Sequence, residues 1–561
     1  MSTTSPTSNF AMPTSCLANV ISFLPSNQLL SIRVNKLWQA ASHQPICQIT
    51  LIQSILRLPN WERTPFLSNC PQLIDAVVEH KFHELLDPNS EITSKFLSEI
   101  VQFKFNESFS EGMNFLKSLS QEKLELITSF SSNSETDDQL TQIIELLPNL
   151  KSLHLEGSCI TGQVFTQISA NNQLENLNLS YCFDLNEEFL KIFSPNATHL
   201  RKVDLSRTGI TGEWLADLPP GNHLEKLILR ECGNLNEEFL ISFFEKATHL
   251  TKIDLSKTNT TGEALSCLPD NNQLEKLFLR QCGHLNEEFL ISFSERATHL
   301  TKIDLSKTNT TGEALSCLPD NNQLETLYLT GCQDLEEAFL KRFFSTADQL
   351  QEAILARGPT TGEGLSFIPI NNQLKILDLS GCQNLEEGFL KDFFEKAFQL
   401  KQVNLSGTNT TGEGLSHILV DNQLKILYLT NCNNLDEESL GSFFSKAAQL
   451  KQVDLSNSKT RGKGLSCLPE DNQLESLIIY KSLPLAPVYF SEEFYKIFFS
   501  KATRLKKIDF YRLRITGESL SYLPGNNQLE SLTLKDCPDL NEEFLERFFS
   551  KAGQLKWVTI L

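Results

Sequence analysis

The chain has 561 residues, of which 69 are acidic and 49 are basic, so its formal net charge is −20. A chain of this length has more residues than one ordinary globular core accommodates, so we expect several domains or a repeat array. The negative charge repels nucleic-acid phosphates and anionic membranes, and no basic run offsets it. These features favour a protein as the partner and argue against nucleic acid or a membrane.

The N-terminal sequence MSTTSPTSNF lacks the basic and then apolar order of a secretory signal, and we expect residues 1–11 to be disordered. No stretch of about 18 apolar residues is present to span a bilayer. The 14 cysteines include no C-x-x-C pair, which favours reduced, buried thiols over zinc or disulfides. We therefore expect a cytoplasmic protein.

Residues 12–50 form the first predicted helical domain, which contains the segment MPTSCLANVISFLPSNQLLSIRVNKLWQAAS. Its proline and its helically spaced apolar residues are Pro13, Val20, Ile21, Leu24, Leu29, Leu30, Val34 and Trp38. Residues 66–145 also show helical spacing with no strand alternation, and we predict a helical linker or cap over 51–145. Its last helix carries Leu140, Ile143, Ile144 and Leu147.

An internal repeat of 50 residues follows, as the leucines at 224, 274 and 324 show, and residues 247–275 recur unchanged at 297–325. Each unit contains two shorter repeats, the first reading L-x-x-L-x-L-x-x-C and the second L-x-x-V-x-L-x-x-T. The opening leucines predict short parallel strands beginning at 150, 174, 200, 224, 250, 274, 300, 324, 350, 374, 400, 424, 450, 474, 505, 529 and 555.

The strand residues alternate between two faces, so Leu177 and Leu179 point into the core while their neighbours point to the other face. Small polar side chains follow the strands and are predicted to satisfy backbone groups where the chain leaves the sheet. They are Cys182, Cys232, Cys282, Cys332, Cys382, Cys432 and Cys537, alternating with Thr208, Thr258, Thr308 and Thr408.

A helix is predicted after each cysteine, from the pattern N-E-E-F-L-x-x-F-F-x-K-A. Asn236 is its expected N-cap, paired glutamates occupy the first turn, and Lys246 lies in the last turn. The second half-repeat, T-G-E-x-L-S-x-L-P, has room for a single helical turn between Gly212 and Pro219. We assign the paired glutamates to stabilisation of the helix dipole, not to catalysis.

These repeats resemble the cysteine-containing leucine-rich repeats of F-box proteins, and the segment at 12–42 resembles an F-box. The resemblance implies an α/β leucine-rich-repeat solenoid over 146–561, a horseshoe with a parallel sheet on its concave face and helices on its convex face, preceded by a small all-α region. It also implies that the F-box-like residues bind the Skp adaptor of a Skp–cullin–F-box ubiquitin ligase. The alternative is a helical cap over the solenoid.

One strand position per half-repeat is predicted to face the partner, and it carries aromatic and aliphatic side chains among acidic ones. Exposed aromatic and aliphatic groups among carboxylates have the composition of a binding hot spot. The candidates are Ile228, Phe278, Tyr328, Tyr428, Ile478, Asp254 and Asp304. Because these positions are free of core constraints, residues copied by duplication are the competing explanation.

Two breaks interrupt the repeat: LQEAILARG replaces the usual strand sequence at 350–358, and residues 486–490 are an apolar insertion. The insertion is either a contact lid or a decayed unit.

Histidines such as His199, His249 and His299 recur before strands and are interpreted as solvated turn residues, so we expect no metal and no cofactor.

The sequence therefore predicts a monomeric, non-enzymatic adaptor that presents a protein substrate to a ubiquitin ligase. Two alternatives are a protein-interaction scaffold without a ubiquitin role, and a secreted effector that uses its F-box in a host cytoplasm.

Overall fold

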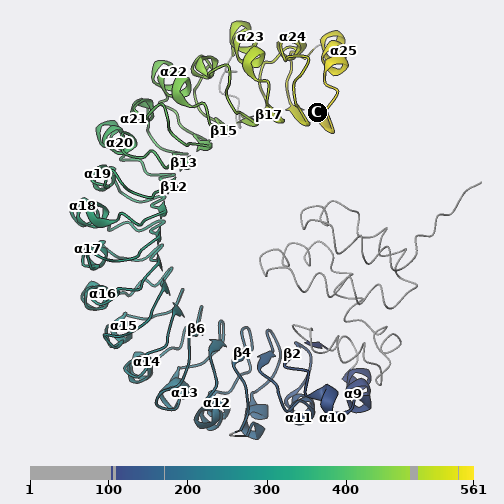
Figure 1. The fold of residues 1–561 in the computed structure, drawn as a ribbon, viewed down its shortest axis with the longest axis vertical. Coiled ribbons are helices and arrows are strands. Elements are labelled where there is room, and N and C mark those ends of the chain that lie inside the picture. The colour runs from purple at the N-terminus through teal and green to yellow at the C-terminus, as the bar shows by residue number, and fades with distance from the viewer. Residues whose placement is uncertain (1–102, 105–108, 170, 481–489, 541, 561) are drawn as a thin grey trace, which may run out of the picture. The chain divides into compact units, whose positions relative to one another are not determined.

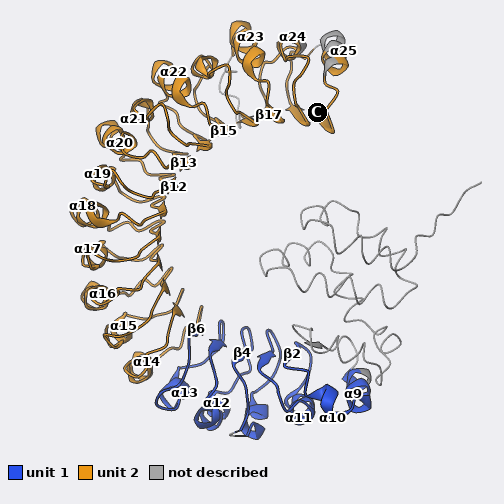
Figure 2. Ribbon diagram, viewed as in Figure 1, with its two compact units in different colours: residues 1–228 blue, residues 229–561 orange. Residues whose placement is uncertain are grey.

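The computed structural model describes residues 103–104, 109–169, 171–480, 490–540 and 542–560. The chain divides into two compact units, Met1–Ile228 and Leu229–Leu561, which are described separately below (Figure 2). Residues 1–102, which include the F-box-like segment and most of the predicted linker, lie outside the described residues.

Unit 1 contains short strands that alternate with helices along the chain (Figure 1). Its strands are β1 (Phe103–Lys104), β2 (Ser129–Ser131), β3 (Ser152–His154), β4 (Asn176–Asn178), β5 (Lys202–Asp204) and β6 (Lys226–Ile228). Its helices are α9 (Phe109–Ser118), α10 (Gln121–Leu124), α11 (Asp137–Leu146), α12 (Glu187–Phe193) and α13 (Glu213–Ala216), with 3-10 turns η1 (Gln163–Gln167) and η2 (Ser194–Asn196).

Unit 2 continues the alternation, with its strands along the inner side of a curved array and its helices along the outer side (Figure 1). Its strands are β7 (Lys252–Asp254), β8 (Lys276–Phe278), β9 (Lys302–Asp304), β10 (Thr326–Tyr328), β11 (Glu352–Ile354), β12 (Ile376–Asp378), β13 (Gln402–Asn404), β14 (Ile426–Tyr428), β15 (Gln452–Asp454), β16 (Ser476–Tyr480), β17 (Lys507–Tyr511), β18 (Ser531–Lys535) and β19 (Trp557–Ile560).

The helices of unit 2 alternate between long and short. The long ones are α14 (Glu237–Phe244), α16 (Glu287–Ser294), α18 (Glu337–Thr346), α20 (Glu387–Phe394), α22 (Glu437–Lys446), α23 (Glu492–Lys501) and α25 (Glu542–Lys551). The short ones are α15 (Glu263–Ser266), α17 (Glu313–Ser316), α19 (Glu363–Ser366), α21 (Glu413–Ser416), the 3-10 turn η3 (Gly464–Cys467) and α24 (Gly517–Ser521).

Each strand pairs in parallel with the next one along the chain within its own unit. The register is constant: Leu277 of β8 lies beside Ile303 of β9, which lies beside Leu327 of β10. Every strand predicted from an opening leucine is present, as β3 through β19. Strand, turn and helix thus repeat as a leucine-rich-repeat solenoid.

The core of each unit is built from the inward positions of the strands and from one face of each long helix. Leu277 and Leu279 are fully buried, whereas Lys276 and Phe278 are not, as the two-residue period requires. Phe243 and Phe244 of α14 cover the sheet, and their ring centroids lie 5.6 Å apart. Because each repeat buries its apolar face only against its neighbours, the array holds together by stacking.

The buried thiols and hydroxyls satisfy strand-end carbonyls, as predicted. Cys282 Sγ donates to the carbonyl oxygen of Leu255 at 3.1 Å, and Thr258 Oγ1 donates to the same oxygen at 2.7 Å. Cys332 Sγ and Thr308 Oγ1 likewise both donate to the carbonyl oxygen of Leu305. Burial raises the pKa of the Cys282 and Cys332 thiols, which keeps them protonated as hydrogen-bond donors.

The long helices begin where the sequence predicted. Asn236 is the N-cap of α14, and its side chain accepts a hydrogen bond from the backbone N–H of Glu238. The two glutamates that follow have different roles, however. The first of each pair reaches the next half-repeat, whereas the second lies on the surface, as Glu287 and Glu288 show.

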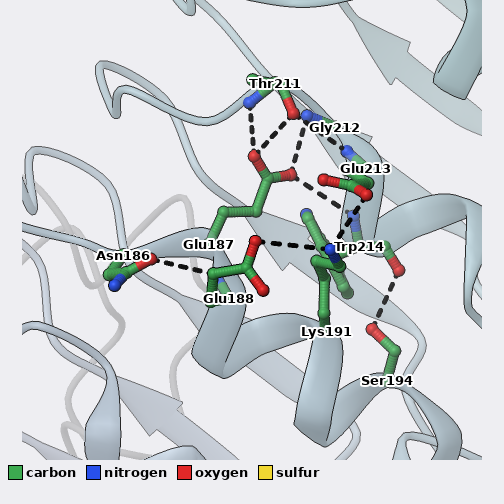
Figure 3. A network of polar contacts seen from close by, with 9 residues as sticks. All are labelled: Asn186, Glu187, Glu188, Lys191, Ser194, Thr211, Gly212, Glu213 and Trp214. Carbon is green, nitrogen blue, oxygen red and sulfur yellow. Dashed lines mark hydrogen bonds and ion pairs between the residues drawn. The ribbon is translucent and has the colours of Figure 1, made fainter.

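Glu187 shows how the first glutamate acts (Figure 3). One carboxylate oxygen accepts from the N–H and the hydroxyl of Thr211, at 2.6 and 2.8 Å, and the other accepts from the N–H of Gly212 at 2.8 Å and of Trp214 at 3.3 Å. The carboxylate therefore caps the short helix of the next half-repeat. We call this contact the carboxylate clamp. The same position is filled by Asp137, Glu237, Glu287, Glu337, Glu387 and Glu437.

The basic residue at the end of the long helix makes the complementary contact. Lys446 Nζ donates to the carbonyl oxygen of Ser416 at 2.7 Å, and Lys501 Nζ donates to those of Ser466 and Leu468. These carbonyls end the preceding short helical turn, where a cation is favoured. Helix α22 thus holds the short turn after it through Glu437 and the one before it through Lys446. Helices α14 and α18 have no basic residue in the last turn, and Lys246, which was predicted there, follows the end of α14 at Phe244.

Gly212 and its equivalents let the chain enter the short helix. Gly212 and Gly262 have φ of 90° and 88°, in the left-handed region that favours glycine. A Cβ at Gly262 would have no contact closer than 3.5 Å, so backbone conformation is the constraint there. At Gly414, by contrast, a Cβ would lie 2.5 Å from the Cβ of Leu390, so close packing of α20 against α21 requires glycine.

The array begins upstream of residue 146, inside the segment 51–145 that the sequence predicted to be entirely helical. Strand β2 pairs with β3, and Asp137 of α11 makes a carboxylate clamp to Thr161 and Gly162. Phe130 and Ser132 occupy the places of repeat leucines, so the leucine pattern did not reveal this strand. The predicted helix at Leu140 and Ile143 is present as α11.

At both breaks in the repeat, the residues that the structure describes keep the fold of the other repeats. The aberrant sequence at 350–358 forms β11, which pairs with β10 and β12 in the usual register. Of the insertion at 486–490, only Phe490 is described; it is buried, with its ring centroid 5.1 Å from that of Phe494. Ser491 caps α23 immediately afterwards.

We predict that Glu287→Ala lowers the free energy of unfolding by about 2 kcal/mol, because it leaves the N–H groups of Thr311 and Ala314 without their acceptor. The matched control is Glu288→Ala, which should cost less than about 0.5 kcal/mol because this neighbouring side chain is exposed. Urea unfolding followed by circular dichroism measures both. Equal losses would mean that charge at the helix start, and not the clamp, stabilises the array.

We also predict that a maleimide labels Cys159 and Cys467, which are exposed, in the native protein. Cys382 and Cys432 should remain unlabelled until the chain is unfolded, since burial raises their pKa, that of Cys382 to about 11, and reduces the thiolate fraction. Peptide mapping by mass spectrometry at mildly alkaline pH measures the labelling. Labelling of Cys382 at the rate of Cys467 would contradict the buried ladder.

Candidate functional site

The six predicted partner-facing residues of unit 2 lie in one column across the outward face of its strands. In unit 2 the register places Asp254 beside Phe278, then Asp304, then Tyr328. Tyr428 and Ile478 both adjoin Asp454 further along the same column. We call the column from Asp254 to Ile478 the strand-face strip. Ile228 belongs to unit 1, where it pairs with Asp204.

Two aromatic residues of the strip, Phe278 and Tyr328, are held by lysines of neighbouring strands. Lys252 and Lys302 lie over the ring of Phe278, with Nζ 5.0 and 5.9 Å from its centroid. Lys302 Nζ also lies 4.4 Å from the centroid of Tyr328 and donates to its hydroxyl at 3.0 Å. That hydroxyl donates to Glu352 Oε1 at 3.2 Å. Phe278 and Tyr328 are thereby oriented in advance, which lowers the entropy lost on binding.

The carboxylates of the strip have a structural role as well. Asp254 Oδ1 accepts from the N–H of Ser256 at 3.0 Å, and Asp304 Oδ1 accepts from the N–H of Ser306 at 2.9 Å. Asp304 is only 7% exposed, between Phe278 and Tyr328, so it offers a partner much less surface than predicted. Asp254 and the aromatic members of the strip are partly exposed.

The far end of unit 2 adds tyrosines that the sequence analysis did not single out. Strands β16 and β17 are five residues long, and this length carries Tyr480 and Tyr511 onto the outward face side by side, with ring centroids 5.4 Å apart. Tyr480 is 38% exposed. The sequence does contain a sign of these two tyrosines. Each directly follows an inward residue, Ile479 or Phe510, at a position where most repeats have a serine or threonine.

The candidate metal ligands and paired carboxylates of the sequence have their places among the described residues. Among them, no group of three histidine, cysteine or acidic side chains has the arrangement of a metal site. His199, His249 and His299 are exposed, as predicted. The glutamates that resembled paired catalytic carboxylates are separated by the carboxylate clamp, since one of each pair faces the next half-repeat.

Within the described ranges, no helix combines the length and the apolar character needed to cross a membrane. The predicted F-box residues, from Pro13 to Trp38, lie outside the described residues.

No protein-family model matches the chain, and no curated protein matches it. Solved structures that match include an internalin (inlF) from Listeria monocytogenes str. 4b F2365, with 19% sequence identity and a TM-score of 0.43 over 61% of this chain and 93% of that chain. Another is TLR13 in its complex with ssRNA13, with 16% identity and a TM-score of 0.41 over 83% of this chain and 75% of that chain. The assignment of a leucine-rich-repeat solenoid rests on the register and core of this chain itself.

Proposed function

We propose that the chain is a non-enzymatic recognition protein whose strand-face strip binds another protein. The observation that carries the proposal is the cluster of Phe278, Lys302 and Tyr328, in which aromatic rings are fixed by cation–π contacts and a hydrogen bond yet remain partly exposed. Aromatic side chains that are rigid before binding are the usual anchors of protein interfaces.

The strip also mixes apolar and charged groups over many strands, which suits a protein surface better than a small molecule. Parallel strands are about 4.8 Å apart, so the register alone spaces the side chains regularly across the array. A small-molecule site needs a concave pocket that encloses most of its ligand. The strip instead presents side chains in line, as an extended interface requires.

We further propose that the F-box-like segment connects this recognition surface to a Skp–cullin–F-box ubiquitin ligase. The support is the sequence resemblance at Pro13, Leu24 and Trp38, together with a repeat array that supplies the substrate-binding half of such an adaptor. In this role the chain brings a protein substrate to the ligase and transfers no ubiquitin itself.

The strip is tested by the double substitution Phe278→Ala and Tyr328→Ala, with Tyr522→Ala as a control tyrosine next to the short helix α24. Tagged proteins are used to co-purify partners from a cell extract, which are quantified by mass spectrometry. We expect the double variant to lose the partner by about tenfold or more, since two aromatic anchors are removed, while Tyr522→Ala retains it. Recovery of the same proteins by all three chains would contradict a role for the strip.

The adaptor role is tested by a pull-down with purified Skp adaptor. We expect the wild-type chain to bind and the variant Leu24→Ala with Trp38→Ala to lose binding, whereas Trp557→Ala, which removes a 73% exposed tryptophan of β19, should bind as wild type. If the wild-type chain does not bind Skp, the ligase role is wrong, and recognition by the strip remains to be judged by its own experiment.

A further inference from the structure

Four lysines stand in a row at the start of neighbouring strands of unit 2. Lys375, Lys401, Lys425 and Lys451 directly precede β12, β13, β14 and β15. The backbone N–H of each of the last three donates to the carbonyl oxygen of the lysine before it, at 2.8 Å, so the four are neighbours in the ladder. At the same position earlier in the unit the residues are Thr251, Glu275, Thr301 and Glu325.

The two central lysines of the row are not neutralised by their surroundings. Lys375 Nζ donates to Gln351 Oε1 at 2.7 Å, and Lys451 Nζ pairs with Glu475 at 3.0 Å. The ammonium groups of Lys401 and Lys425 meet no carboxylate among the described residues. A positive row therefore exists in a chain whose net charge is −20.

Apolar side chains lie on the loops that lead into the same strands. Ile370 precedes β12 and is 72% exposed, and Val420 precedes β14 and is 75% exposed. Phe398, which is partly exposed, lies on the intervening loop before β13. The first two loops are in contact, because Asn372 Nδ2 donates to the carbonyl oxygen of Lys396 at 3.1 Å.

The fold does not require apolar side chains at these loop positions. In the equivalent places, other repeats of the unit carry Asp270, Thr298 and Asp320 and still build the same strands and helices. An exposed aliphatic group at three-quarters of its maximum area adds little to a core. Exposed apolar groups on successive loops that lead to a row of lysines are therefore a candidate interaction site.

We propose that Ile370, Phe398 and Val420, together with Lys375, Lys401 and Lys425, form a docking site for an acidic segment of a partner protein that also carries large apolar side chains. We call these six residues the rim patch. The inference rests on the proposed protein-binding function and specifies the chemistry of one part of the partner. Carboxylates of the segment pair with the lysines, and its apolar side chains cover the exposed aliphatic groups, which strengthens both kinds of contact by excluding water.

The surroundings of the patch favour a narrow acidic segment over an anionic membrane. Glu325 and Asp348 precede the patch along the array, Glu470 and Asp471 follow it, and Asp421 adjoins Val420. A flat anionic bilayer wide enough to meet the lysines would also meet these carboxylates, and like charges repel. A peptide of one chain's width can follow the lysines and meets fewer of these carboxylates than a bilayer does.

Binding is measured by fluorescence anisotropy with the full chain. The probe is a fluorescein-labelled peptide of alternating Glu-Glu and Leu-Phe pairs, and the control peptide has lysine in place of every glutamate. One patch variant is Ile370→Asp with Val420→Asp, and the other is Lys401→Thr with Lys425→Glu. Each substitution introduces the residue that another repeat already carries at that position, namely Asp270, Asp320, Thr301 and Glu325, so the fold should be retained.

The matched control is Lys459→Asn with Lys463→Glu, which changes the net charge as much as the lysine variant does. Both control lysines are exposed and lie outside the rim patch, and the introduced residues are those of the preceding repeat, Asn409 and Glu413. We expect each patch variant to weaken binding of the acidic peptide by about tenfold or more, and the control to change it by less than about twofold. The lysine peptide should not bind.

The proposal is overturned if the wild-type chain does not bind the acidic peptide, if the control variant weakens binding as much as the patch variants do, or if both peptides bind equally. It is also overturned if vesicles containing phosphatidylserine bind the wild-type chain and the acidic peptide does not, which would indicate a membrane surface. The variant Phe278→Ala with Tyr328→Ala separates this test from that of the strip. Loss of a cellular partner by that variant, with no effect of the patch variants on the peptide, would retain the proposed function and reject the rim patch.

Discussion

The carboxylate clamp is the interaction on which the rest of the array depends. A helical turn as short as α17, Glu313–Ser316, cannot satisfy its own N–H groups, because the first four of any helix have no partner inside it. Glu287 supplies that partner from the preceding half-repeat, and a cation at the far end of the long helix meets the carbonyls of the short turn before it. Successive half-repeats are therefore held together by charge as well as by burial.

This arrangement explains why the interior is nearly uniform while the surface varies. The inward leucines, the thiols, the clamp glutamates and the left-handed glycines each satisfy a requirement that recurs in every repeat, so few alternatives are tolerated. The outward strand positions and the loops that lead into the strands meet no such requirement. Phe278, Tyr328, Ile370 and Val420 all lie at these permissive positions, where a residue can be chosen for a partner without loss of stability.

The strand-face strip and the rim patch present different chemistry to a partner. In the strip, Lys302 is engaged with the rings of Phe278 and Tyr328, and Asp304 between them is largely buried. In the patch, Lys401 and Lys425 meet no described carboxylate, and the aliphatic groups beside them are well exposed. The strip is therefore suited to shape-dependent contact with aromatic anchors, and the patch to recognition of negative charge.

The sequence by itself determined the repeat, its strands from β3 onward, the N-cap of α14 and the thiol ladder, because each follows from a local pattern or a fixed spacing, as Leu277, Asn236 and Cys282 show. It also identified the column of Phe278 and Tyr328, since side chains alternate strictly along a strand. Only the tertiary structure decided that Glu287 caps the next half-repeat, that Asp304 is buried, and that the loop before β12 contacts the loop before β13. These relations join residues of different half-repeats, and their distances depend on how the half-repeats stack, which no local pattern contains.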